Sequence, residues 1–176
     1  MAWFKRGPQP GPQSGSQPAR PPAARIDKLL NERAILFPTP GLEKPALLEA
    51  AVAACCTGHG LGQPAPFLAR VREREEGIST TLDIGLSLPH ARVDGLERIA
   101  AALALLPHGA ADPRQPGVTI RAMFLFFSPN RREAFTSHLQ VLRGVSSLFA
   151  RPGFFDSLLA LREPAQVLEL LRRQAP

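Results

Sequence analysis

The chain has 176 residues, with 21 lysines and arginines against 15 aspartates and glutamates and a sequence pI of about 10.6. Four basic residues and no acidic one lie in residues 1–25, which leaves 17 basic against 15 acidic groups in the rest. Because so much of the excess charge lies in this one segment, we expect no nucleic-acid-binding function. The longest apolar run, residues 99–106, is far shorter than the roughly 20 residues that span a bilayer, so we expect no stable membrane insertion.

Residues 1–25 contain six prolines and three glycines but only two large apolar residues, Trp3 and Phe4. Such a segment buries too little apolar surface to offset the entropy lost on ordering, so we expect a disordered or polyproline-like tail. No apolar run follows Lys5 and Arg6, as a secretory signal would require. We therefore expect a cytoplasmic protein with one folded domain over residues 26–176.

The first part of the domain reads as helical segments around one short strand. The pattern predicts a helical segment at 26–31, a strand at 34–37, and helices at 42–56 and 66–76. Cys55 and Cys56 lie within the first long helix and lack the spacing of a redox or zinc motif. We expect them to be small buried thiols in a reducing cytoplasm.

The stretch that follows ends at a histidine. Large apolar residues occupy every second position from 82 to 88, namely Leu82, Ile84, Leu86 and Leu88. This alternation predicts a half-buried strand over residues 79–88. Pro89 cannot donate to a strand ladder, so we expect it to end the strand and to leave His90 on the next loop. A loop held by a rigid strand is a common position for a reacting side chain.

The remaining elements complete one layered α/β domain. Residues 99–106 fit a helix by their alanines and a buried strand by their length. Residues 118–127 read as a strand, and helical patterns follow at 133–150, 153–161 and 164–174. Helices thus precede, interrupt and follow a small set of strands, which predicts a single α/β layer architecture.

The four histidines differ in their surroundings. His59 and His108 lie beside glycines, and we expect both to be exposed in loops. Ser137 and Gln140 match a capping box, which would place His138 in the first turn of a helix, near free backbone N–H groups that suit an anion. The alternative is that His138 only decorates the surface of a helix.

Familiar catalytic templates are absent from the sequence. It has no phosphate-binding loop with Gly-Lys-Ser/Thr, no His-Glu-x-x-His zinc helix and no nucleophile elbow, so we expect no metal and no cofactor. The two histidines, an arginine and several hydroxyls fit an imidazole that briefly carries a phosphoryl group. Phosphoryl transfer mainly requires positioning and charge stabilisation, which a small site can supply.

Two separated motifs resemble a known family. The first is Arg74-Glu75, Ser79-Thr80 and Gly85-Leu86-Ser87-Leu88-Pro89-His90, and the second is the strand 124–129 followed by His138-Leu139-Gln140-Val141-Leu142. Together they resemble phosphotransferase-system (PTS) IIA proteins of the fructose, mannitol and nitrogen-regulatory type (EIIA type 2). The resemblance covers about residues 26–174.

The resemblance implies a central mixed β-sheet flanked by helices, with residues 99–106 as one of its strands. It implies that His90 accepts a phosphoryl group from HPr or an HPr-like phosphocarrier, and that His138 contacts this group. Arg74 and Thr80 would be its electrostatic and polar neighbours. The phosphoryl group would then pass to a cysteine of a IIB domain, or would act as a regulatory signal to other proteins.

Two outputs share this chemistry, sugar uptake and nitrogen-related regulation, and the motifs do not separate them. A third possibility is a protein-binding module that works without phosphorylation, with the basic tail making the contacts. Such a module has no need of both histidine motifs.

Overall fold

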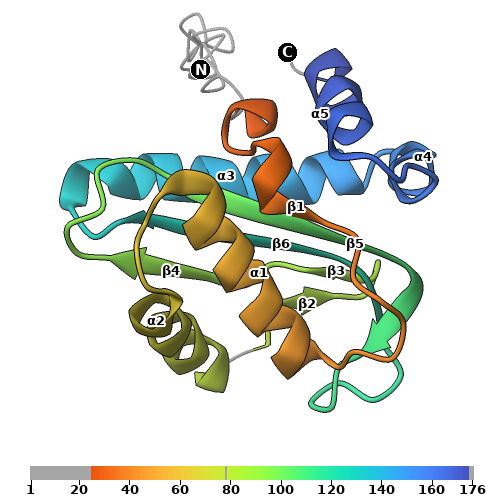
Figure 1. Cartoon of the computed structure of the whole chain (residues 1–176), viewed down its shortest axis with the longest axis horizontal. Helices are drawn as coiled ribbons and strands as arrows, with labels where there is room; N and C mark the ends of the chain where they lie inside the picture. The colour runs from red at the N-terminus through yellow and green to blue at the C-terminus, as the bar shows by residue number, and fades with distance from the viewer. Residues whose placement is uncertain (1–24, 78, 175–176) are drawn as a thin grey trace, which may run out of the picture.

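The computed structural model describes residues 25–77 and 79–174. The predicted tail therefore lies almost wholly outside the described residues. The chain forms a mixed β-sheet with helices on both faces (Figure 1). None of the described helices is long and apolar enough to cross a membrane.

The sheet is built around two long antiparallel strands, β5 (Ala100–Ala111) and β6 (Thr119–Pro129). Strand β1 (Ile35–Leu36) runs parallel to β5. On the other side, β3 (Leu86–Ser87) and β4 (His90–Val93) both run parallel to β6, each along a different part of it. Strand β2 (Thr81–Leu82) pairs antiparallel with β3 at the edge. The sequence 86–93 therefore lies against β6 for almost its whole length.

The helices fall into two groups, one on each face of the sheet. Helices α1 (Lys44–His59) and α2 (Pro64–Gly77) lie on one side, where Figure 1 shows α1 crossing the sheet and α2 beside β4. The opposite face carries α3 (Phe135–Phe149), α4 (Phe154–Leu159) and α5 (Pro164–Arg173). Short 3-10 turns complete the list: η1 (Ile26–Lys28), η2 (Glu32–Ala34) and η3 (Arg132–Ala134).

Strand β5 resolves the ambiguity at residues 99–106. Its alanines at 100, 102 and 104 all face α1 and pack in the cluster that holds Cys55 and Cys56. Leu103 and Leu105 face the other way, into the core under α3 and α4. Small side chains on one face let a helix pack closely on the strand, so the alanines follow the two-residue period of a strand and not a helical one.

Two cysteines behave as the sequence predicted. Cys55 and Cys56 are free thiols with exposed fractions of 0% and 2%. Burial raises the pKa of Cys55 to about 12 and also raises the pKa of Cys56, so both stay protonated at neutral pH.

The expected strand at residues 79–88 is wrong in detail, because the segment folds into the β2–β3 hairpin. Its turn contains Gly85, whose φ is +84° and whose position would bring a Cβ within 2.8 Å of the Thr119 carbonyl oxygen. Only glycine fits such a turn and such a close approach. His90 is likewise not on a loop: Pro89 separates two strands, and His90 is the first residue of β4. A proline between strands leaves both neighbours free to pair.

The positions of two other histidines also differ from expectation. His59 is the last residue of α1, where its Nε2 lies 2.9 Å from the Ala101 carbonyl oxygen. His108 lies in strand β5, where it is exposed. Both residues were expected in loops because glycines follow them. Gly60 instead caps α1 with a left-handed conformation, and Gly109 lies within β5.

Candidate functional site

His90 is positioned by the pairing of β4 with β6. In this register His90 lies opposite Phe126, and the Phe126 amide donates to the Pro89 carbonyl oxygen at 3.1 Å. The two rings stack with centroids 5.5 Å apart and an angle of 17° between their planes. The backbone before the histidine is fixed as well, because the Leu88 amide donates to the Thr80 carbonyl oxygen at 3.0 Å. The imidazole therefore stands on a rigid part of the sheet.

The hydrogen bond of His90 fixes which of its two ring nitrogens carries the proton. Nδ1 lies 2.8 Å from the Leu88 carbonyl oxygen. A carbonyl oxygen only accepts hydrogen bonds, so Nδ1 carries the proton and Nε2 keeps a lone pair in the neutral ring. Burial lowers the pKa of His90, and the charge of Arg74 lowers it further, against the raising effects of the Leu88 bond and Glu75. The ring is therefore neutral at pH 7, with an unprotonated Nε2.

His138 lies beside His90, although it belongs to helix α3. It is the fourth residue of α3, and its ring centroid lies 5.2 Å from that of His90. Its Nδ1 lies 2.7 Å from the Ser128 hydroxyl oxygen. Burial lowers the pKa of His138 to about 4, with further contributions from the charges of His90, Arg92 and Arg74. At pH 7 the site therefore holds two neutral imidazoles.

The predicted capping box at the start of α3 is wrong. The helix begins at Phe135, its N-cap is Ala134, and no side chain caps it. The 3-10 turn η3 leads directly into α3, so the helix begins three residues earlier than it would with Ser137 as its N-cap. His138 still falls in the first turn, as predicted, and it is buried rather than decorating the helix surface.

Residues of α2, β4 and α3 line one cavity of about 370 Å³: Arg70, Glu73, Arg74, His90, Ala91, Arg92 and His138. Arg70 donates to Glu73 at 2.8 Å, so one positive charge in the lining is matched by one negative charge. Arg74 and Arg92 supply two more positive charges. The cavity is therefore suited to an anion.

Thr80 does not line this cavity and is instead bound to Glu75. Its Oγ1 donates to Glu75 Oε1 at 2.5 Å, and Thr80 is not among the residues that line the cavity. The structure thus brings His90, His138 and Arg74 together, with Thr80 held on a carboxylate nearby. The roles expected for these four residues stay predictions.

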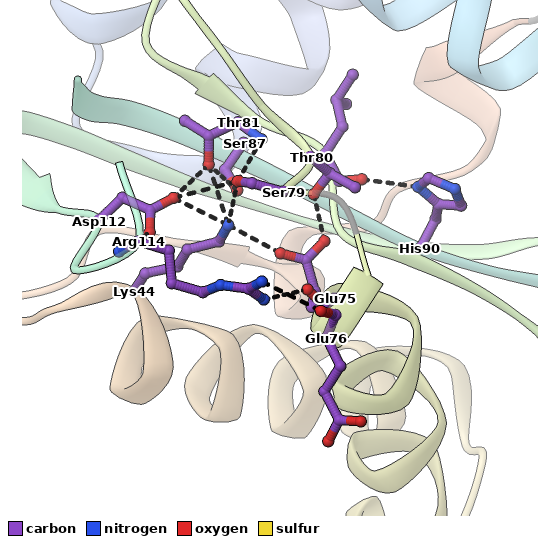
Figure 2. A network of polar contacts seen from close by, with 11 residues as sticks. Lys44, Glu75, Glu76, Ser79, Thr80, Thr81, Ser87, His90, Asp112 and Arg114 are labelled. Carbon is purple, nitrogen blue, oxygen red and sulfur yellow. Dashed lines mark hydrogen bonds and ion pairs between the residues drawn. The ribbon is translucent and has the colours of Figure 1, made fainter. Parts of the chain in front are cut away.

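Figure 2 shows a buried cluster of charged side chains that the sequence did not reveal. Lys44 Nζ lies 2.8 Å from Glu75 Oε2 and 3.0 Å from Asp112 Oδ2, and it also donates to the Ser79 and Thr81 hydroxyls. Burial raises the pKa of Asp112, but the hydrogen bonds from Lys44 and Thr81 outweigh it, and the pKa lies below its usual value. We call Lys44, Glu75 and Asp112 the lysine cluster.

Sequence reasoning also missed Arg92. It lies two residues after His90, so the strand period puts both on the same face of β4. A strand at residues 90–93 would have signalled this, but Pro89 led us to expect a loop. Lys44 and Asp112 give no such signal, since each is a charged residue followed by a proline and belongs to no motif.

The geometry suits the transfer of an anionic group to a nitrogen. Among residues 25–77 and 79–174, no three His, Cys, Asp or Glu side chains are grouped to hold a metal ion. The cavity offers instead a neutral imidazole with a free lone pair, a second imidazole and arginine side chains. These groups fit a nucleophile and the donors that would hold a phosphoryl group.

Comparisons with known proteins found a matching protein family and matching solved structures. The family model described as "Phosphoenolpyruvate-dependent sugar phosphotransferase system, EIIA 2" matches residues 28–174. None of the curated proteins compared with the chain matches it.

Solved structures share the fold. The nitrogen regulatory protein IIA-Ntr from Neisseria meningitidis is 21% identical, with a TM-score of 0.74 over 84% of this chain and 99% of that one. The IIA mannitol protein from Escherichia coli is 19% identical, with a TM-score of 0.67 over 81% of this chain and 98% of that one. A complex of IIA mannitol with phosphorylated IIB mannitol from Escherichia coli matches at 18% identity and a TM-score of 0.67, over 82% of this chain and 97% of that one. These likenesses confirm the predicted mixed sheet with flanking helices.

Proposed function

Because the chain belongs to the EIIA 2 family of the phosphoenolpyruvate-dependent sugar phosphotransferase system, we propose that His90 carries the phosphoryl group of this phosphocarrier. The donor is a phosphohistidine of HPr or an HPr-like carrier. The donor is itself phosphorylated at the expense of phosphoenolpyruvate, an intermediate of central metabolism. The proposal therefore includes a cytoplasmic location.

The proposed step uses the tautomer that the hydrogen bonds favour. The lone pair of His90 Nε2 attacks phosphorus, a new N–P bond forms, and the N–P bond of the donor breaks. The donor imidazole takes back the electron pair of that bond. The proton of His90 stays on Nδ1, whose hydrogen bond to the Leu88 carbonyl oxygen 2.8 Å away orients the ring during the transfer.

The observation that carries the proposal is the meeting of two buried, neutral imidazoles in a cavity lined by arginines. The rings lie 5.2 Å apart, close enough for both to contact one phosphoryl group. If Ser128 donates its hydroxyl proton to His138 Nδ1, the Nε2–H of His138 is free to donate to a phosphoryl oxygen. Arg74 adds positive charge at the same place.

The surface around the cavity supports contact with a partner protein. Phe135 and Leu139 flank His138 on α3, and each exposes 48% of its surface. Large apolar residues exposed beside a charged cavity are typical of a protein interaction site. We propose that the phosphoryl donor and acceptor proteins dock on these side chains.

The acceptor that follows His90 is, in this proposal, a cysteine of a IIB partner. The related IIA mannitol protein was solved in complex with phosphorylated IIB mannitol. In the nitrogen-regulatory branch the phosphorylated form would instead alter binding to other proteins. Both outputs begin with the same phosphorylated His90.

The test is the intact mass of the full chain after incubation with phosphoenolpyruvate, enzyme I and HPr. We expect the wild type to gain one acid-labile phosphoryl group and His90→Gln to gain none. His108→Gln is the matched control, because His108 also follows a Leu-Pro pair but is exposed, and it should be labelled like the wild type.

Labelling of His90→Gln at the wild-type rate would sink the assignment of the acceptor. An unlabelled wild type, with HPr shown to be charged, would contradict the proposed chemistry. It would instead favour the module that binds without phosphorylation.

A further inference from the structure

Besides Arg74 of α2, the cavity has an arginine on β4, Arg92, which lies on the same face of the strand as His90. Arg92 lines the cavity that holds His90 and His138, and its partner across the strand pair is Ser128. Ser128 is also the residue that hydrogen-bonds His138. The register of β4 with β6 therefore places Arg92 beside the His138 end of the cavity.

The guanidinium of Arg92 is held in place by contacts that leave its charge unmatched. Its Nη2 donates to the Arg131 carbonyl oxygen at 2.7 Å, and its Cζ lies 5.4 Å from the centre of the Phe135 ring. A carbonyl dipole and an aromatic face orient a guanidinium without neutralising it. Within the described part of the chain, no carboxylate forms an ion pair with Arg92.

One donor of this side chain has no hydrogen-bond partner. Arg92 Nε is buried, and no described residue accepts a hydrogen bond from it. A buried donor left unsatisfied costs about 1–3 kcal/mol, and more when the group is charged. Unsatisfied buried donors are rare in native proteins, and a bound group that supplies the missing acceptor is one physical reason to retain such a donor.

We propose that Arg92 binds an oxygen of the phosphoryl group on His90, which makes it a further anion-binding residue of the site; this rests on the proposed function. A phosphoryl group carries close to two negative charges at neutral pH. The cavity lining has three arginines against one glutamate, so its net positive charge suits that anion. The planar donor fork of a guanidinium also fits phosphate oxygens in a way that a lysine does not.

The first experiment uses two phosphoryl donors of different size on the full chain. One is charged HPr, and the other is potassium phosphoramidate, from which His90 Nε2 takes the phosphoryl group as the donor P–N bond breaks and ammonia leaves. We expect Arg92→Gln to slow labelling by about tenfold to a hundredfold with both donors, since loss of one oriented donor commonly costs this much or more. Arg92→Lys should recover only part of the rate.

Arg98→Gln is the control for lost charge, because Arg98 is exposed on the loop between β4 and β5. It should be labelled at the wild-type rate. Wild-type rates for Arg92→Gln with both donors would overturn the inference. Slowing with HPr alone would also overturn it, because Arg92 would then contact the partner and not the phosphoryl group. A wild type that neither donor labels would mean that the proposed function itself has failed.

A second measurement is made on the wild-type protein, and a substitution serves only to assign one signal. The Nε–H signal of Arg92 in a ¹⁵N NMR spectrum, assigned by its loss in Arg92→Lys, should shift when wild-type His90 is phosphorylated. Its exchange with water should also slow, because Nε–H gains an acceptor. An Arg92 signal that stays unchanged on phosphorylation would contradict the contact.

Discussion

The segment from Glu75 to Arg92 contributes to two buried polar regions that are built differently. In the lysine cluster, Lys44 lies within 3.0 Å of both Glu75 and Asp112, so cation and carboxylates meet inside the fold. In the cavity, His90 and His138 are neutral, and Arg92 has no carboxylate partner in the described residues. Each charged group of the lysine cluster has an oppositely charged partner within the fold. In the cavity, by contrast, Arg92 has a positive charge and an Nε–H donor that no described carboxylate or acceptor satisfies.

This difference separates groups that stabilise the fold from groups that bind. A buried charge costs several kcal/mol unless a partner and hydrogen bonds offset it. In the lysine cluster, Lys44 is the partner of both carboxylates, and neighbouring hydroxyls of Ser79, Thr80 and Thr81 add hydrogen bonds. The cavity avoids the cost at its imidazoles by keeping them uncharged, and the proposed phosphoryl group would supply the negative charge. Substitutions in the two regions should therefore fail in different ways.

The largest effect should come from removing the cation of the lysine cluster. Lys44→Met leaves Glu75 and Asp112 buried without a positive partner, because Arg114 donates to backbone carbonyls and not to these carboxylates. Breaking a buried ion pair on one side costs about 3–5 kcal/mol. We expect this loss in the free energy of unfolding, measured by urea denaturation at pH 7.

Lys28→Met is the matched control, since Lys28 is exposed at the start of the domain. It should change the free energy of unfolding by less than about 0.5 kcal/mol. If Lys44→Met were as stable as Lys28→Met, the lysine cluster would contribute nothing to stability and the contrast with the cavity would fail.

The next effect is the pH dependence of stability, which should distinguish the two regions by their pH windows. The pKa of His138 in the folded protein is about 4, below the roughly 6.5 of an unfolded histidine. As pH falls from 6.5 to 4, the unfolded chain takes up a proton before the folded one, so stability falls. This linkage amounts to about 3 kcal/mol for His138, and His90 acts in the same direction.

Asp112 should act only at lower pH. Its pKa is lowered in the fold, so its contribution is present above the unfolded pKa of about 3.9 and is lost below it. We therefore expect His138→Gln to flatten the loss of stability between pH 6.5 and 4, measured by urea denaturation at several pH values. The exposed His108→Gln should keep the wild-type slope. Equal slopes in both variants would contradict a buried, neutral His138.

The sequence predicted the elements that have a clear period and failed where a single residue decided the structure. Strand 118–127 and the helices after it follow hydrophobic patterns, and all of them are present. The hairpin at 81–87 was missed because the alternation continues through its turn, so nothing in the pattern marks the reversal at Gly85. Three alanines of β5, at 100, 102 and 104, follow a strand period, but helix propensity obscured it.

The site shows the same division. Sequence motifs pointed to His90, His138 and Arg74, which line one cavity. Predicting Arg92 as a site residue would have required recognising a strand after Pro89. Lys44 and Asp112 are 68 residues apart in the chain and are brought together only by the fold. Contacts between residues so distant in the chain are set by topology, which local pattern does not encode.

The smallest expected effect concerns Thr80, whose hydroxyl binds Glu75 of the lysine cluster and whose carbonyl oxygen accepts from Leu88, just before His90. Its hydroxyl proton is donated to Glu75 Oε1 at 2.5 Å. A threonine hydroxyl has one proton to donate, so it cannot bind a phosphoryl oxygen as a donor while it holds Glu75. We expect Thr80→Val to lower the free energy of unfolding by about 1 kcal/mol, the usual worth of one hydrogen bond. Labelling of His90 should stay within about threefold of the wild type, a change of well under 1 kcal/mol in the barrier.

Thr80→Ser keeps the hydroxyl and should retain both stability and labelling. A fall of tenfold or more in labelling for Thr80→Val, with Thr80→Ser unaffected, would place the Thr80 hydroxyl on the phosphoryl group, as the family resemblance implies. In that case Thr80 would turn from Glu75 to the phosphoryl group when His90 is charged. The lysine cluster would then lose one hydrogen bond at each transfer, and the two regions would be coupled through this one side chain.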